Sequence, residues 1–145
     1  MTNTAILEKL PYTKPFLFVD KLVSITNERV EGCYTFSEDE FFYQGHFKEY
    51  PVTPGVILTE CMAQIGLVCL GIYLLKDESQ TEFTIALSSH SIDFYKPVFP
   101  GEQVVVVSEK VYFRFHKLKC NVKMLDTNGA LIAKGTISGM LAPKQ

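Results

Sequence analysis

Residues 55–75 read GVILTECMAQIGLVCLGIYLL, a stretch of apolar and small side chains that directly follows Pro54. Proline is favoured in the first turn of a helix, because the N–H that it lacks would have no intrahelical partner there. A helix that is apolar almost all round must be enclosed by protein on most faces. The stretch is long enough to span a membrane, but Thr59, Glu60 and Gln64 interrupt it. We therefore expect a buried central helix and no membrane span.

The sequence on both sides of this helix is typical of β-structure. Alternating or β-branched segments bounded by turn residues predict strands, and they lie at residues 16–26, 30–36, 83–88, 92–95, 104–115, 119–125 and 130–141. Residues 126–129, DTNG, are a strong hairpin turn. A short helix is expected over residues 5–10.

The order of these elements predicts an α+β fold. An apolar helix with strands on both sides is most economically buried by a curved antiparallel sheet wrapped around it. Residues 1–145 contain no linker or repeat, so we expect a single domain. One sheet cannot cover every face of such a helix, and we expect a second copy of the chain to cover the rest in a homodimer.

The composition limits the kinds of partner. Of the 145 residues, 47 % are apolar and 21 % are charged, as in globular proteins. The net charge of −2 and the lack of a basic cluster argue against nucleic acid or an anionic membrane. The opening MTNTAILEKLPYTKP lacks the basic and apolar regions of a signal peptide. No pair of cysteines has CxxC spacing, so we expect reduced thiols in the cytoplasm, at Cys33, Cys61, Cys69 and Cys120.

A lone histidine and a lone acid near the start of the helix are the candidate chemical groups. His46 lies in a Pro/Gly-punctuated loop, and Glu60 lies on the second helical turn, on the same face as Gln64. A carboxyl group at this depth is unfavourable unless it is paired, hydrogen-bonded or neutral. At the helix start, the N–H of Gly55 has no intrahelical partner and carries the positive end of the helix dipole.

A base, an acid and an oxyanion donor together suit the removal of water from a 3-hydroxyacyl thioester. A neutral imidazole at His46 can take the C2 proton near pH 7. The N–H of Gly55 can stabilise the negative charge that develops on the thioester oxygen. A carboxyl group in an apolar wall, such as Glu60, can protonate the leaving hydroxyl.

Plainer interpretations of the same residues stay open at this point. A loop histidine is often a surface residue, and Glu60 can simply be paired with His46. One histidine and one acid are too few ligands for a metal, and His90 and His116 show no ligand spacing. Cys61 lies beside an acid, which disfavours the thiolate that a nucleophile needs.

Three blocks of sequence resemble the 3-hydroxyacyl-[acyl-carrier-protein] dehydratases of the hotdog fold. Residues 44–64, QGHFKEYPVTPGVILTECMAQ, are similar to the active-site segment of that family, including the spacing from His46 to Glu60. Residues 10–22, LPYTKPFLFVDKL, are similar to its opening segment, and residues 92–104, IDFYKPVFPGEQV, to a later strand-turn-strand. The three blocks occur in the right order and imply the hotdog fold.

The resemblance implies a role for each matching residue. His46 would be the base for the C2 proton, with its ring held by the carbonyl of Val52. Glu60 from the other subunit of the dimer would handle the hydroxyl, assisted by Gln64. The N–H of Gly55 would polarise the thioester. The related dehydratase/isomerases carry Asp at the position of Glu60, which favours the simple, non-isomerising branch.

The resemblance also implies the substrate and its carrier. The acyl group would arrive on the phosphopantetheine arm of acyl carrier protein and enter a tunnel between subunits, in fatty-acid or related polyene or lipid biosynthesis. No metal or organic cofactor is implied. Lys96 and Lys48 are candidates to contact the acidic carrier. Further assembly into a trimer of dimers stays open, as do two alternatives on the same fold: an acyl thioesterase and a non-catalytic subunit that binds an acyl carrier or a lipid.

The sequence departs from the family pattern at two places. Residues 48–50, Lys-Glu-Tyr, stand where relatives have a Pro-Gly turn after the His-Phe pair, and Tyr12-Thr13 replaces the His-Arg of the opening segment. Both changes leave the candidate catalytic residues intact. They bear on the shape of the loop beside the tunnel, and therefore on the acyl chain length.

Overall fold

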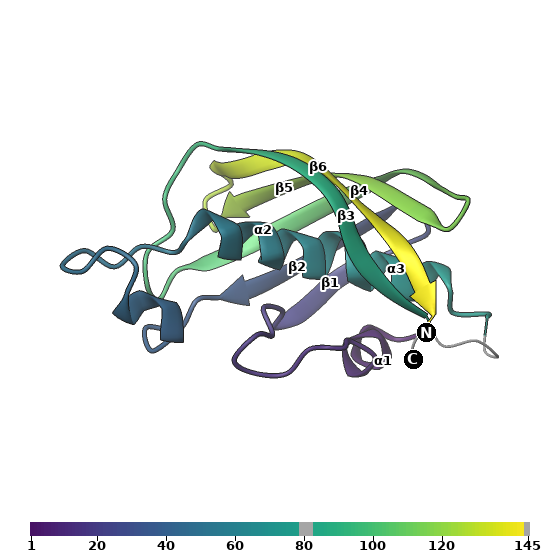
Figure 1. The fold of residues 1–145 in the computed structure, drawn as a ribbon, viewed down its shortest axis with the longest axis horizontal. Helices are drawn as coiled ribbons and strands as arrows, with labels where there is room; N and C mark the ends of the chain where they lie inside the picture. Colours follow the sequence, from purple (N-terminus) through teal and green to yellow (C-terminus); the bar gives the residue numbers. More distant parts are fainter. Residues whose placement is uncertain (79–82, 144–145) are drawn as a thin grey trace.

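The chain forms a six-stranded antiparallel sheet that curves around one helix in a computed structural model, which describes residues 1–78 and 83–143 (Figure 1). The strands are adjacent in the order β1-β2-β4-β5-β6-β3. Their bounds are β1 (Lys21–Ile25), β2 (Arg29–Thr35), β3 (Phe83–Phe94), β4 (Gln103–Arg114), β5 (Lys117–Asp126) and β6 (Leu131–Pro143). The predicted α+β hotdog architecture is confirmed.

The central helix lies in the concave face of the sheet (Figure 1). It consists of α2 (Gly55–Ala63), a π-helical segment η2 (Gln64–Cys69) and α3 (Leu70–Leu74). The helix is apolar enough to cross a membrane, yet 78 % of its most apolar window is buried inside the protein. The prediction of a buried core helix is therefore correct. Two short elements complete the fold, α1 (Asn3–Glu8) and the 3₁₀ helix η1 (Phe41–Gln44).

The π-helical segment has a local cause in the packing of the helix on β4. Ser108 donates a 2.8 Å hydrogen bond from Oγ to the carbonyl oxygen of Gly66. The N–H of Leu70 bonds to the carbonyl of Leu67 rather than to that of Gly66, its partner in a regular α-helix. A Cβ on Gly66 would lie 3.0 Å from Cβ of Ser108. A side chain that inserts into the helical ladder is a known cause of such irregularities, and the close approach requires glycine.

The structure corrects two predicted strands. Residues 16–19 do not form the start of a strand, because their backbone turns toward the central helix, where the N–H of Phe18 donates to the side chain of Gln64. Residues 83–88 and 92–95 are one continuous strand, β3, rather than two. The pairing with β6 shifts between Leu87 and Ser89, so the strand continues through a bulge at this point.

The two edges of the sheet differ. The strand β1 has five residues and is flanked by α1, whose Asn3 donates from Nδ2 to the carbonyl of Leu22. The strand β3 has twelve residues and pairs only with β6 in the described part of the chain. Leu87 and Phe94 on β3 are about half exposed. A long edge strand without cover is a ready template for pairing with another chain.

Candidate active site

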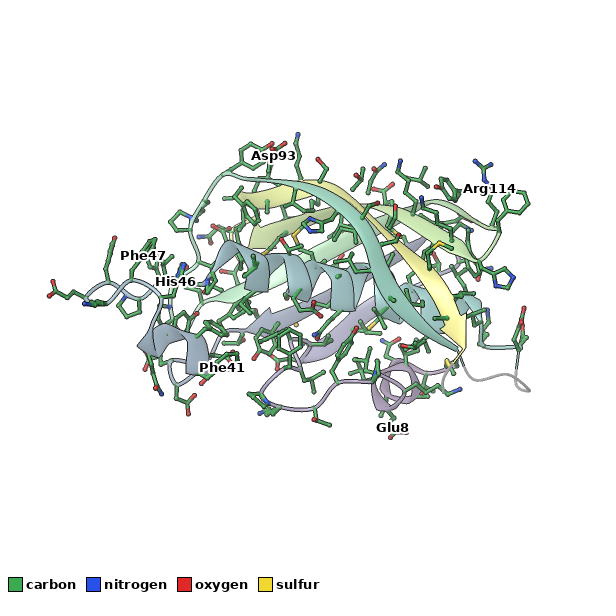
Figure 2. The ribbon with its side chains drawn as sticks, in the orientation of Figure 1. Glu8, Phe41, His46, Phe47, Asp93 and Arg114 are labelled. Atoms are coloured by element: carbon green, nitrogen blue, oxygen red, sulfur yellow. The ribbon has the colours of Figure 1, made fainter. Side chains whose placement is uncertain are left out.

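The loop that carries His46 is fixed at both ends by buried contacts. Tyr43 on η1 forms a 2.6 Å hydrogen bond from its hydroxyl group to Oγ1 of Thr53. The N–H of Thr53 donates to the carbonyl of Val98, 2.9 Å away. The N–H of His46 donates to the carbonyl of Phe42. These bonds hold the histidine beside the start of α2 (Figure 2).

The ring of His46 is held on one edge and on one face. Its Nδ1 lies 2.9 Å from the carbonyl oxygen of Val52. A carbonyl oxygen only accepts, so Nδ1 carries a proton, and in the neutral form of the ring the lone pair is on Nε2. The ring of Phe47 stacks on the imidazole at 4.5 Å between centroids and 17° between planes. The histidine therefore presents Nε2 as a base.

Glu60 is held by Gln64, one helical turn further along. The side-chain amide of Gln64 is fully buried. Its Nε2 donates to Oε2 of Glu60 at 2.9 Å and to the carbonyl of Phe16 at 3.0 Å. Its Oε1 accepts from the N–H of Phe18 at 2.8 Å. The opening segment thus fixes the amide, and the amide fixes the carboxylate.

The start of α2 offers a free donor. The N–H groups of Ile57 and Leu58 both donate to the carbonyl of Pro54. Within residues 1–78 and 83–143, the N–H of Gly55 has no acceptor. A Cβ on Gly55 would lie 3.4 Å from the ring of Phe94. The unpaired N–H can donate to a ligand at the positive end of the helix dipole, beside the ring of Phe94.

Tyr12, one of the two residues that depart from the family's opening segment, lies near Glu60 in the structure. Burial, followed by the negative charge of Glu60, raises the pKa of Tyr12 to about 12. The phenol of Tyr12 therefore stays protonated across the physiological range. The sequence gives no signal for this proximity, because 48 residues separate the two side chains.

A single chain does not pair the two principal candidates. Within the described residues, His46 and Glu60 share no hydrogen bond, and Glu60 is bound by Gln64 instead. The simple His–Glu pair that the sequence left open is therefore absent from the described part of the chain. Cys61 is fully buried and donates to the carbonyl of Phe18. Burial raises the pKa of the Cys61 thiol well above its usual value, which disfavours a nucleophilic role.

The two lysines suggested for carrier contact have different surroundings. Lys96 forms an ion pair with Asp126 at the β5–β6 turn. This partner raises the pKa of Lys96 and lowers that of Asp126, so the charge of the lysine is already compensated. Lys48 is exposed in the loop directly after Phe47, where the N–H of Tyr50 closes a tight turn on the carbonyl of Phe47.

Comparison with known proteins assigns the family. Residues 10–137 match the family model of the FabA-like domain. The chain belongs to the FabA-like family. It is 32 % identical over 139 residues to the 3-hydroxyacyl-[acyl-carrier-protein] dehydratase FabZ of Lactococcus lactis subsp. cremoris, a match that covers 93 % of this chain and 91 % of the relative. It is 34 % identical over 135 residues to FabZ of Caldicellulosiruptor bescii, with 91 % and 92 % covered.

Solved structures show how widely this FabA-like fold is shared. The dehydratase heterocomplex ApeI:P from Xenorhabdus doucetiae has a chain with a TM-score of 0.82 and 13 % identity, covering 99 % of this chain and 93 % of that one. A mutant thioesterase from Pseudomonas aeruginosa reaches 0.74 at 6 % identity, with 99 % and 96 % covered. At these identities the likeness shows the fold alone.

Proposed function

We infer that this protein is a 3-hydroxyacyl-[acyl-carrier-protein] dehydratase of fatty-acid biosynthesis, as its FabZ relatives are named. The observation that carries the inference is the orientation of His46, whose Nδ1 donates to the carbonyl of Val52, so that in the neutral ring Nε2 is the basic nitrogen. A neutral, oriented imidazole beside a free helix N–H is what removal of a C2 proton from a thioester requires.

In the proposed reaction, three groups act on the substrate. Nε2 of His46 takes the C2 proton, and the C2–H electrons form the C2=C3 double bond as the C3–O bond breaks. The N–H of Gly55 stabilises the charge on the thioester oxygen. A protonated carboxyl at Glu60 gives its proton to the leaving hydroxyl, so that water departs. The proton on the imidazolium then returns to the carboxylate through solvent, and both residues regain their starting states.

The carboxylate that works with His46 belongs to the second subunit of a homodimer. Two observations support this arrangement. Within the described part of one chain, His46 and Glu60 share no hydrogen bond. The strand β3 is an uncovered edge that exposes Leu87 and Phe94 on the side of the helix. Pairing of two β3 strands buries these side chains and brings the two helices together.

The acyl chain and its carrier approach from the end of the molecule that holds the His46 loop. Exposed apolar side chains gather around the start of α2 and its neighbouring loops, at Phe47, Tyr50, Val56, Phe94, Tyr95 and Phe99. Such a patch suits an acyl chain or a covering subunit. Lys48, on the same loop, is the better placed of the two lysines to contact an acidic carrier protein, because Lys96 is paired with Asp126. The four free cysteines accord with a cytoplasmic location.

A mixed-dimer assay tests the shared site. His46→Ala and Glu60→Gln dimers are each expected to be inactive. In a mixed dimer, the His46 of one chain meets the Glu60 of the other, and one of the two sites is intact. Reassembly of equal amounts should therefore restore about a quarter of wild-type activity, since half of the dimers are mixed. No recovery from properly mixed dimers would place both residues in one subunit and contradict the proposal.

A second experiment, which follows both possible products, separates dehydration from hydrolysis. Hydrolysis is the chief alternative because thioesterases share this fold. Purified protein is incubated with 3-hydroxyacyl thioesters of several chain lengths, linked to acyl carrier protein. Enoyl absorbance and free thiol are followed together. Enoyl product without thiol is expected. Thiol release would indicate a thioesterase, and the absence of both products would indicate a binding subunit.

A further inference from the structure

Phe47 adopts a backbone conformation that a phenylalanine rarely takes. Its φ is 61°, in the left-handed region that favours glycine and asparagine. Its side chain is also 59 % exposed, so the ring gains little from burial in its own chain. Neither backbone preference nor core packing explains a large aromatic residue here.

The two other non-glycine residues with positive φ have an ordinary explanation. Phe115 and His116 form the two-residue turn between β4 and β5, with φ of 53° and 62°. A two-residue hairpin of this kind requires positive φ at both positions. Phe47 lies in no hairpin. Its conformation instead places its ring flat against the imidazole of His46 (Figure 2).

We propose that Phe47 is a positioning residue for the dehydration, whose ring holds the His46 imidazole in place and stabilises the imidazolium that forms when it takes the C2 proton. The stack is nearly parallel, at 17° and 4.5 Å, so the cation forms over the face of the aromatic ring. An aromatic face attracts a cation through its quadrupole. The carbonyl of Val52 fixes the Nδ1 edge of the His46 imidazole, and the ring of Phe47 limits rotation of the imidazole about that hydrogen bond. The proposal rests on His46 acting as the base.

Four variants distinguish the effect of the aromatic ring from the effect of the backbone conformation. Phe47→Leu removes the aromatic face, and Phe47→Tyr keeps it. Phe47→Gly removes the ring and also relieves the left-handed backbone, so a loss of activity in this variant cannot be ascribed to strain. Phe115→Gly is the matched control, because it relieves the same strain at an 88 % exposed phenylalanine at the opposite end of the molecule (Figure 2 labels the adjacent Arg114).

Steady-state kinetics give the first readout. Loss of a cation–aromatic contact should lower kcat roughly 3- to 30-fold in Phe47→Leu and Phe47→Gly, with KM little changed. Phe47→Tyr should restore kcat, and Phe115→Gly should leave it unaltered. An unchanged kcat in Phe47→Leu, an equal loss in Phe47→Tyr, or a rise in KM alone would overturn the role. Each of the last two results would point to contact with substrate instead.

NMR gives a second readout that does not depend on turnover. In protein labelled at histidine Cε1, the stacked ring should shift the His46 signal upfield, and His46→Ala assigns that signal among the three histidines. The shift should vanish in Phe47→Leu, persist in Phe47→Tyr and be unaffected by Phe115→Gly. A wild-type protein that shows the shift but forms no enoyl product would overturn the proposed function. A wild-type enzyme that forms product without the shift would overturn the role of Phe47 alone.

Discussion

Gln64 donates a 2.9 Å hydrogen bond from its side-chain amide to the carboxylate of Glu60. Its other end accepts from the N–H of Phe18 at 2.8 Å. Gln64→Leu should therefore act on both stability and activity, because it leaves the Phe18 N–H without its acceptor and the carboxylate without its donor. We expect urea denaturation to show a loss of about 1–3 kcal/mol, the usual penalty for an unsatisfied buried group.

A matched variant, Gln64→Glu, tests the donation from the amide to Glu60. A carboxylate can still accept from the N–H of Phe18, but it cannot donate to Glu60 and repels it. This variant should regain none of the enoyl-forming activity, and the burial of a second carboxylate beside Glu60 should lower the stability further. If Gln64→Glu were as active as wild type, the amide would not be what positions Glu60.

Glu60→Gln should remove activity and leave the fold intact. The amide oxygen of the new side chain can still accept from Nε2 of Gln64, so the buried network persists. An amide cannot supply the proton that the leaving hydroxyl requires. General acid–base groups contribute typically about 10²- to 10⁴-fold, and we expect a loss of this order in the enoyl assay with little change in thermal midpoint. Turnover within a factor of about ten of wild type would exclude Glu60 as the acid.

Gly135→Ala should disrupt the pairing between β6 and β3. A Cβ at this position would lie 1.8 Å from the carbonyl oxygen of Ser91, a backbone atom that cannot move without moving its strand. We expect a loss of about 1–3 kcal/mol in unfolding free energy, as for other overpacked sites. Gly45→Ala is the control, since nothing in the chain lies within 4 Å of its Cβ and its φ of −125° is accessible to alanine. Equal stability of the two variants would contradict the prediction.

Alkaline pH should destabilise the fold through its buried thiols. Burial raises the pKa of Cys69 to about 12 and that of Cys120 to about 11, from the usual 9.0. The folded state therefore keeps protons that the unfolded state releases, and linkage makes the stabilisation complete below pH 9 and progressively lost above it, up to the folded pKa values. Urea titrations between pH 8 and about pH 11 should show this fall. Cys69→Ala should reduce its slope, and an unchanged slope would remove this thiol from the explanation.

Much of the fold follows from local sequence patterns. The apolar stretch after Pro54 is long and unambiguous, and the DTNG turn is reproduced, with Gly129 at a φ of 86°. The two errors lie where the local pattern competes with a distant contact. Phe18 is bound by Gln64, 46 residues away, and β3 continues through Ser88 because β6 tolerates a bulge there. The π-helical segment has no sequence signal, because it depends on Ser108 of another element.

Some residues of the candidate site can be found from the sequence, and others only from the structure. His46, Glu60, Gln64 and Gly55 could be identified from the sequence because each is an unusual residue type for its predicted position. Tyr12 could not, since its proximity to Glu60 arises only when the opening segment folds over the helix. Nor could the left-handed conformation of the residue after His46, which no propensity favours.

The uncovered edge at β3 affects how readily the newly made chain pairs with the wrong partner in the cell. The twelve residues of this strand include no lysine and no proline, the residues that commonly guard an open edge. If two β3 strands pair in a homodimer, as proposed, a newly made chain without its second copy is exposed to indiscriminate strand pairing with other proteins. Dilution should favour the unpaired chain by mass action, so scarce chains should be degraded sooner than abundant ones.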